Sequence, residues 1–328
     1  MKRTSDPVYP MKLILRFIIV ALILVAFISY RTSSSTYRHP SEKPSPSSSS
    51  EKGKEPFPFT GISFHASGWM QIYQGGVAKY IQENYKLDTC NMVGTSGGAL
   101  IACTLCCDIP MDLAFNEMIG VRKINKHNNV FQMCPHTKEV IKKMLPLNCI
   151  ELIQDRLTIV CSKLDNTNVV PLYKRTFGTY IDVMNYLNAT VHIPIFDGIF
   201  PQTTDNELLY DGMLTDSHSG ILDPCLKVTW DSKCYCGCTL DNNTIFPAIE
   251  IPLSWCAFPP DERILELLYF HGYYSAQKYF SGKDDDDTLL SETVVSELKN
   301  ELERQKMNYL LIQGSVFLGG CLGVLQMI

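Results

Sequence analysis

The sequence has no large excess of either charge and no basic block in the part expected to fold. Lysine and arginine together number 29 against 34 aspartates and glutamates, which gives a formal net charge of −5 over 328 residues. Proteins that bind nucleic acid normally carry a basic patch that neutralises phosphates. This composition therefore argues against a nucleic-acid partner, while the length suffices for one large or two small domains with a substantial core.

The sequence also has no small-residue cleavage site after its first apolar stretch. Residues Phe17–Ile28 are apolar without interruption, and the stretch from Leu13 to Tyr30 approaches the roughly 20 residues that span a bilayer. A cleaved signal peptide is the alternative, but Ile28-Ser29-Tyr30-Arg31 is a poor cleavage site. We therefore expect residues 1–32 to form an uncleaved, single-pass membrane anchor.

Composition divides the rest of the chain into three parts. Residues 33–58 are rich in serine, proline and lysine, which predicts a disordered linker. A folded domain is expected over residues 59–282. The tail, residues 283–328, begins with an acidic loop and continues with an amphipathic helix over 291–308. Its apolar end is either a second membrane or lipid-facing segment or a buried terminal helix. The helix has one apolar stripe, formed by Val294, Val295, Leu298 and Leu302.

The thirteen cysteines, an odd number, do not settle the redox compartment. Cys103 and Cys161 lie in apolar runs, where a free cysteine packs as a small hydrophobic residue. The C-x-C-x-C cluster over residues 234–238 has no fourth ligand at a familiar zinc spacing, so we predict no metal site. Disulfides involving Cys225 and this cluster, and glycosylation of the sequons at Asn188 and Asn242, matter only if the domain faces a lumen.

The segment with the most informative chemistry is Gly94-Thr95-Ser96-Gly97-Gly98. Residues 87–93 before it are expected to form a strand, and the small apolar residues 99–103 after it to open a helix. Such a turn holds a serine hydroxyl on a strained backbone, and the helix N-terminus directs positive potential at it. Outside this context the same residues form an ordinary loop. The context makes Ser96 the candidate nucleophile.

Two further segments are candidates for the same site. Residues 61–64 are expected to form a strand, followed by a loop and a helix over about residues 72–81; the Ser67 and Gly68 N–H groups in that loop could form an oxyanion hole. Residues 157–161 are expected to form a buried core strand. A strand over 207–210 ends in Asp211-Gly212, where the aspartate either faces a serine on a neighbouring strand or sits in a surface turn.

Taken in order, these segments resemble a known family. Ser67-Gly68-x-x-x-Ile72-Tyr73-x-x-Gly76-Val77, Gly94-Thr95-Ser96-Gly97-Gly98 and Tyr210-Asp211-Gly212 match the patatin-like phospholipase pattern. Further segments resemble the adiponutrin and adipose triglyceride lipase branch: His192-Ile193-Pro194, Gly198-Ile199-Phe200-Pro201, Lys227-Val228-Thr229-Trp230, Phe258-Pro259-Pro260 and Gly272-Tyr273. The resemblance covers roughly residues 59–280.

The resemblance implies a three-layer α/β/α fold and a Ser–Asp dyad without a catalytic histidine. Ser96 would attack an ester carbonyl, and Asp211 would take its proton and later activate water. Ser67 and Gly68 would provide the oxyanion hole, supported by the motif glycines Gly94, Gly98 and Gly212. The implied substrates are acylglycerols and phospholipids at a membrane or lipid-droplet surface, and no cofactor or metal is implied. The endoplasmic reticulum and the lipid droplet are then the candidate locations.

Three residues depart from the family pattern. Ala66 and Gln71 stand where glycine is common, and Met213 stands where a small residue is usual. Ala66 could impede a backbone angle that glycine permits, and the other two could narrow or reline the site. Besides a membrane-associated serine acylhydrolase, two alternatives stay open: an α/β-hydrolase with His218 or His271 as base, and a non-catalytic lipid-binding scaffold.

Overall fold

The computed structural model describes residues 53–124, 130–153, 155–166, 168–194, 196–216, 225–233, 240–282 and 292–304. The chain divides into two compact units, Met1–Lys52 and Gly53–Ile328, and all described residues belong to the second. The predicted anchor, most of the predicted linker, the acidic loop and the apolar C-terminal segment lie outside them. Within the described ranges, no helix combines the length and the apolarity needed to cross a bilayer.

The centre of the second unit is a mainly parallel sheet. Its strands lie in the order β10-β9-β2-β4-β5-β8-β7, and β6 pairs with β5. The first five of these strands run parallel, whereas β6 and β8 are antiparallel to β5. The bounds are β2 (Gly61–Phe64), β4 (Asn91–Thr95), β5 (Leu157–Asp165), β6 (Asn168–Lys174), β7 (Gln202–Thr204), β8 (Glu207–Asp211), β9 (Cys225–Val228) and β10 (Thr244–Ile245).

A second, two-stranded sheet lies at the start of the unit. Strand β1 (Glu55–Pro56) pairs in parallel with β3 (Tyr85–Lys86). Because β1 falls within the last residues of the predicted linker, 33–58, regular structure begins slightly before residue 59.

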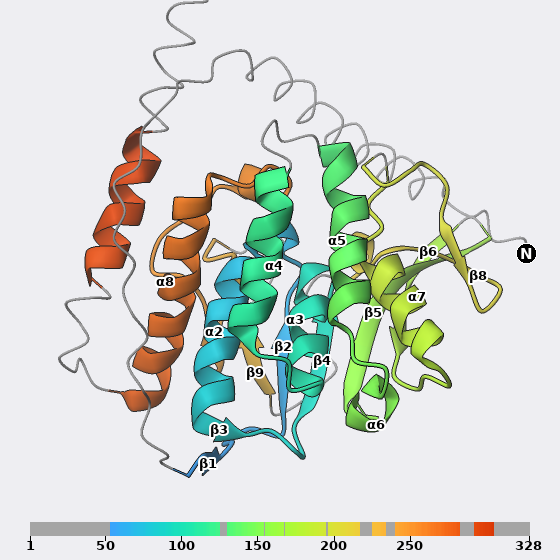
Figure 1. Cartoon of the computed structure of the whole chain (residues 1–328), viewed down its shortest axis with the longest axis horizontal. Helices are drawn as coiled ribbons and strands as arrows, with labels where there is room; N and C mark the ends of the chain where they lie inside the picture. Colours follow the sequence, from blue (N-terminus) through green and yellow to red (C-terminus); the bar gives the residue numbers. More distant parts are fainter. Residues whose placement is uncertain are drawn as a thin grey trace, which may run out of the picture. The chain divides into compact units, whose positions relative to one another are not determined.

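The helices cover one face of the sheet (Figure 1). They are α2 (Gln71–Asn84), α3 (Gly97–Cys106), α4 (Met111–Ile124), α5 (Val130–Met144), α6 (Cys149–Ile153), α7 (Tyr180–Thr190) and α8 (Glu262–Ser281). The steps from β2 to β4 and from β4 to β5 proceed in one direction across the sheet, and right-handed crossovers place their helices on the same side. Helix α8 packs on α2, and α7 packs on α3 and α5.

The predicted α/β class is present as a mixed α/β fold with a central sheet and helices packed against it. The three-layer arrangement that the resemblance implies stays a prediction.

Most elements lie where the sequence places them, and one is shorter. Strands β2 and β5 and helix α2 contain the expected residues, and α3 begins directly after Ser96. The expected strand over residues 87–93 is wrong in its first half. There, the Cys90 N–H donates to the Leu87 carbonyl at 3.1 Å and closes a turn, and β4 starts only at Asn91.

Hydrophobic burial also agrees with the sequence. Cys103 and Cys161 are buried thiols outside any disulfide, as expected of small hydrophobic side chains. In the helix over residues 292–304, Leu298 and Leu302 are buried, so the predicted apolar stripe faces protein. An ion pair of 2.9 Å between Arg263 Nη2 and Glu297 Oε2 joins this helix to α8.

Candidate active site

The ends of two strands meet against one edge of β5. Thr95, the last residue of β4, pairs with Val160, and Asp211, the last residue of β8, pairs with the next residue, Cys161. Because β4 is parallel and β8 antiparallel to β5, their C-terminal ends approach each other head-on. This topology brings Ser96 beside Asp211, although they lie 115 residues apart in sequence.

The two side chains are joined by a short hydrogen bond. Ser96 Oγ donates to Asp211 Oδ2 at 2.7 Å, and the Met213 N–H donates to Asp211 Oδ1 at 2.9 Å. Both Ser96 and Asp211 are buried. Burial raises the pKa of Asp211 to about 7, although the hydrogen bonds from Met213 and Ser96 and the charge of His192 oppose this shift. A carboxyl group that ionises near neutral pH and accepts a serine proton is suited to general-base chemistry.

The backbone at Ser96 is strained. Its φ of 55° and ψ of −129° fall in a region that non-glycine residues rarely occupy. Close packing around the turn depends on its glycines. A Cβ on Gly94 would lie 2.5 Å from the Ala99 Cα, and a Cβ on Gly98 would lie 2.4 Å from the Phe64 carbonyl oxygen. These glycines therefore let α3 approach β4 and β2 closely enough to form the turn.

Thr190 stabilises this turn, and we did not predict its role from sequence. The Ser96 N–H donates to Thr190 Oγ1 at 2.9 Å, and the Thr190 hydroxyl donates to the Val160 carbonyl at 2.5 Å. Thr190 is the last residue of α7 and is fully buried. In the sequence it is only the third residue of a sequon, which gives no sign that its hydroxyl contacts the Ser96 turn.

His192 fixes the other side of the site. Its carbonyl accepts the Asp211 N–H at 2.9 Å, and so holds the end of β8. The ring atom Nδ1 lies 2.8 Å from Asp197 Oδ2, and Nε2 donates to the Phe200 carbonyl at 2.8 Å. The segment that resembles the adiponutrin branch therefore positions Asp211 through the backbone.

The loop predicted to stabilise an oxyanion lies against the Ser96 turn. Gly68 has a φ of +51°, and a Cβ there would lie 2.3 Å from the Cys256 carbonyl oxygen. A Cβ on Gly97 would come within 2.8 Å of Ser67 Oγ, so the loop and the turn are in close contact. The Ser67 hydroxyl is buried and has no hydrogen-bond partner among the described residues. The first N–H groups of α3, which have no acceptor within the helix, lie beside it.

The three departures from the family pattern do not obstruct this arrangement. Ala66 is not among the non-glycine residues with positive φ, so its backbone needs no glycine, and its carbonyl accepts the Trp230 Nε1–H at 2.8 Å. Met213 is 48% exposed and contributes its N–H to Asp211. Gln71 is buried at the start of α2, with its Cβ beside Gly97.

Neither histidine proposed for the hydrolase alternative is shown at the serine. His271 is buried in α8, where Nε2 accepts the Ala248 N–H at 3.2 Å and the ring packs on Tyr73. Burial lowers the pKa of His271 to about 4. His218 lies outside the described residues, as does the cluster over 234–238. Across the described ranges, no group of three or more histidine, cysteine or acidic side chains could hold a metal ion.

Comparison with known proteins identifies relatives that are similar to part of this chain. The omega-hydroxyceramide transacylase of Mus musculus is 25% identical over 247 residues, which cover 66% of this chain and 40% of the transacylase. The patatin-like phospholipase domain-containing protein 5 of Mus musculus is 24% identical over 166 residues, which cover 48% of this chain and 38% of that protein. The chain therefore spans less than half the length of these relatives.

No family model matches the chain. Among solved structures, VipD from Legionella pneumophila superposes with a TM-score of 0.42 at 12% identity, covering 72% of this chain and 69% of VipD.

Proposed function

We propose that this chain is a serine acylhydrolase of the patatin-like family and that it cleaves lipid esters by means of Ser96 and Asp211. The observation that carries this proposal is the 2.7 Å hydrogen bond from the Ser96 hydroxyl to a buried carboxylate whose pKa is raised to about 7. An unactivated serine is a weak nucleophile, and an adjacent base is what activates it.

In the proposed first step, Ser96 Oγ attacks the ester carbonyl while Asp211 accepts its proton. The negative charge on the tetrahedral intermediate is stabilised by the α3 N-terminus, by N–H groups of the loop at Ser67 and Gly68, and by the Ser67 hydroxyl. When the intermediate collapses, the bond to the alcohol oxygen breaks and Asp211 returns the proton to that oxygen. The products are an acyl-Ser96 ester and a free alcohol.

In the second step, Asp211 takes a proton from water while the water oxygen attacks the acyl-Ser96 carbonyl. The bond between the carbonyl carbon and Ser96 Oγ then breaks, Asp211 returns the proton to Oγ, and a fatty acid is released. An acceptor alcohol can replace water and receive the acyl group. This second candidate, acyl transfer, is favoured by the relative that is a transacylase. Both outcomes share the acyl-Ser96 intermediate and differ only in the nucleophile of the second step.

We also propose that the protein acts at a membrane or lipid-droplet surface, with the endoplasmic reticulum as a candidate location. The apolar N-terminal segment supports attachment. Near the site, Ile199 and Phe200 are 72% and 82% exposed, while the carbonyl of each accepts a hydrogen bond, from Tyr210 and His192 respectively. Apolar side chains held out from an anchored loop are suited to contact with lipid.

The test is labelling by a fluorophosphonate in membranes that carry the full-length chain. Wild type should be labelled, and Ser96→Ala and Asp211→Asn should lose labelling and lipid-ester turnover. His271→Ala and His218→Ala serve as controls and should retain both. Absence of labelling in folded wild type would contradict the proposal and favour the scaffold. Loss of activity in a histidine variant that remains folded would favour a histidine base instead.

A further inference from the structure

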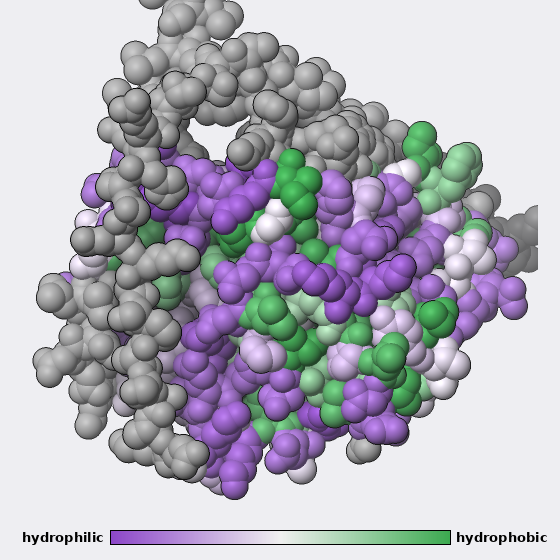
Figure 2. All heavy atoms as spheres, viewed as in Figure 1, coloured by the Kyte–Doolittle hydropathy of each residue, from purple (hydrophilic) through white to green (hydrophobic). Residues whose placement is uncertain are grey.

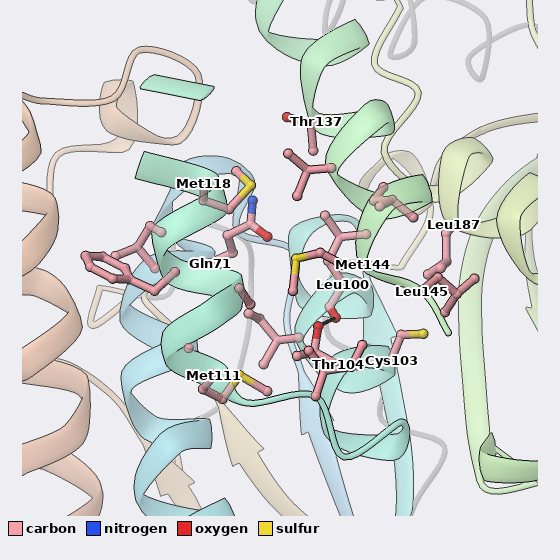
Figure 3. Close-up of a pocket in the computed structure, with 18 of the residues that line it drawn as sticks. Gln71, Leu100, Cys103, Thr104, Met111, Met118, Thr137, Met144, Leu145 and Leu187 are labelled. Atoms are coloured by element: carbon pink, nitrogen blue, oxygen red, sulfur yellow. Dashed lines mark hydrogen bonds between the residues drawn. The ribbon is translucent and has the colours of Figure 1, made fainter. Parts of the chain in front are cut away.

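The helices that cover the sheet enclose an apolar cavity, but this cavity supplies no charge to the candidate site. It has a volume of about 60 Å³ and lies between α2, α3, α4 and α5. None of the described residues that line it is charged, and Figure 3 shows mainly apolar side chains converging on it. Hydrophilic residues predominate on this face of the molecule, and hydrophobic ones come to the surface in the region of α4 and α5 (Figure 2). A positive charge that compensates the buried carboxylate of Asp211 therefore has to come from another side.

A buried cluster of charged side chains lies next to the end of β8. His192 follows α7, Asp197 lies five residues further along the same loop, and Lys138 belongs to α5. Asp197 Oδ2 lies 2.8 Å from His192 Nδ1 and also forms an ion pair with Lys138 Nζ. The side chains of His192 and Asp197 are only 7% and 9% exposed. Dissolved salt therefore screens these charges little.

The contacts of the His192 ring favour its doubly protonated form. Nε2 donates to the Phe200 carbonyl, which can only accept a hydrogen bond. Nδ1 faces the Asp197 carboxyl group. Although burial opposes the shift, hydrogen bonds from His192 and Lys138 lower the pKa of Asp197, so this group is an ionised acceptor as well. A neutral imidazole has one N–H and satisfies one acceptor, whereas the imidazolium satisfies both.

The cluster is held against the strand that carries Asp211. The His192 carbonyl accepts the Asp211 N–H at 2.9 Å, and the ring stacks on Tyr210 with the centroids 5.9 Å apart. The Tyr210 hydroxyl donates to the Ile199 carbonyl at 3.1 Å, which closes the loop onto β8. Burial raises the pKa of Asp211, and the charge of His192 opposes that shift.

The net charge of the cluster is positive when His192 is an imidazolium. This ring and the Lys138 ammonium together outweigh the single Asp197 carboxylate. Two other titratable groups are recorded nearby: Tyr210 on β8, and Cys134 on α5, which is influenced by the charges of Asp197, Lys138 and Asp211. Burial raises the pKa of both, so both are neutral near pH 7.

We propose that His192 is a positioning residue for Asp211. Held as an imidazolium by Asp197 and the Phe200 carbonyl, it supplies a buried positive charge that favours the carboxylate form of Asp211. The proposal rests on the proposed function, in which that carboxylate takes the proton of Ser96. It adds to the backbone contact a role for the charge of the ring.

The test compares wild type with His192→Gln, which removes the charge and keeps a side-chain N–H for the Phe200 carbonyl. The rate of fluorophosphonate labelling of Ser96 is measured from about pH 5 to about pH 9. Loss of the charge should move the midpoint of the profile upwards by about one pH unit. The variant should therefore be about tenfold slower below the wild-type midpoint of about 7, and within about twofold of wild type above both midpoints. A residue that only supported the loop would lower the rate by the same factor at every pH, and that result would overturn the proposal.

Lys163→Gln is the matched control. Lys163 lies on β5 and forms an ion pair of 2.9 Å with Glu207 on β8, but its side chain is 33% exposed. Its removal also takes a positive charge from beside β8, and because water screens that charge, the midpoint should stay within about 0.2 pH units of wild type. A shift as large as that of His192→Gln would show that His192 has no special role.

A measurement that needs no labelling separates this proposal from the proposed function. The ionisation of the Asp211 carboxyl group is followed by ¹³C NMR in wild type and in His192→Gln. If no fluorophosphonate labels wild type, the proposed chemistry fails, and a midpoint raised by about one pH unit in the variant would still support the role of His192. Equal midpoints would overturn it.

The protonation of the ring can be tested in wild type, so the result does not depend on the folding of a variant. The chain has seven histidines, which are labelled with ¹⁵N. One ring should carry protons on both nitrogens at about pH 7.5, where an unperturbed histidine is mostly neutral. If every ring is singly protonated there, His192 is not an imidazolium and the proposal is wrong.

Discussion

At the residue scale, the site depends on two side chains held in costly environments. Ser96 adopts a backbone conformation that few non-glycine residues tolerate, and Asp211 is a fully buried carboxyl group. Backbone strain of this kind costs about 1–3 kcal/mol, and burial destabilises the ionised form of a carboxyl group unless hydrogen-bond donors or positive charge compensate. Thr190, Met213 and His192 supply the hydrogen bonds that hold both residues in place.

The first residue-scale prediction concerns pH. Asp211 must be ionised to accept the serine proton, and its pKa is raised to about 7. The rate of fluorophosphonate labelling should therefore rise with pH through about 7 and level off above it, with about a tenfold loss for each unit below. A rate independent of pH between 5 and 8 would contradict this role for Asp211.

Stability should change in the opposite direction with pH. Because the pKa of Asp211 is higher in the folded than in the unfolded chain, the folded protein binds an extra proton between the two values. Relative to Asp211→Asn, wild type should lose about 1.4 kcal/mol of unfolding free energy per pH unit from about pH 4 to about pH 7. Denaturant titrations of the two proteins at several pH values measure this difference.

The second residue-scale prediction concerns Thr190. Thr190→Val keeps the shape of the side chain but leaves the Ser96 N–H and the Val160 carbonyl without their partner, at a cost of about 1–3 kcal/mol for each buried group. Labelling of Ser96 should slow by about tenfold or more. Thr190→Ser should restore the rate, since it keeps the hydroxyl. Equal rates in the valine and serine variants would show that the hydroxyl does not position Ser96.

At the scale of secondary-structure elements, the decisive feature is the meeting of β4 and β8 against β5. Strands with apolar or β-branched runs, such as β2 and β5, can be predicted from sequence because burial imposes that composition. Their spatial order cannot, because it depends on which strands pair across long connections. The head-on approach of Thr95 and Asp211 along β5 is a property of this pairing.

Gly212 tests the junction between the two strands. A Cβ there would lie 2.4 Å from the Val160 carbonyl oxygen and 2.8 Å from Thr95 Cγ2. Gly212→Ala should therefore force the end of β8 away from β4, lower stability by about 1–3 kcal/mol and slow labelling of Ser96. Gly120→Ala, which meets nothing, should gain about 0.5–1 kcal/mol and keep the wild-type rate. Thermal unfolding and labelling of both variants provide the comparison.

At the scale of the whole molecule, the described unit carries the candidate site, and the sequence before it carries the predicted attachment. Deleting residues 1–32 should move the protein from the carbonate-resistant membrane fraction to the supernatant, because the apolar stretch Phe17–Ile28 is lost. Ser96→Ala, which does not touch this stretch, should stay with the membrane. If the deleted protein remains in the membrane fraction, residues 1–32 are not its sole attachment.

The short motifs of the candidate site could be predicted from the sequence. The Ser96 turn, the loop at Ser67 and Gly68, and Asp211-Gly212 could be identified because backbone geometry demands glycine at fixed spacing. The roles of Thr190 and His192 emerged only from the fold, because each acts through a hydrogen bond to a residue distant in the chain or through its own backbone carbonyl. The apolar cavity between α2, α3, α4 and α5 likewise arises from packing, and no single segment encodes the space between helices.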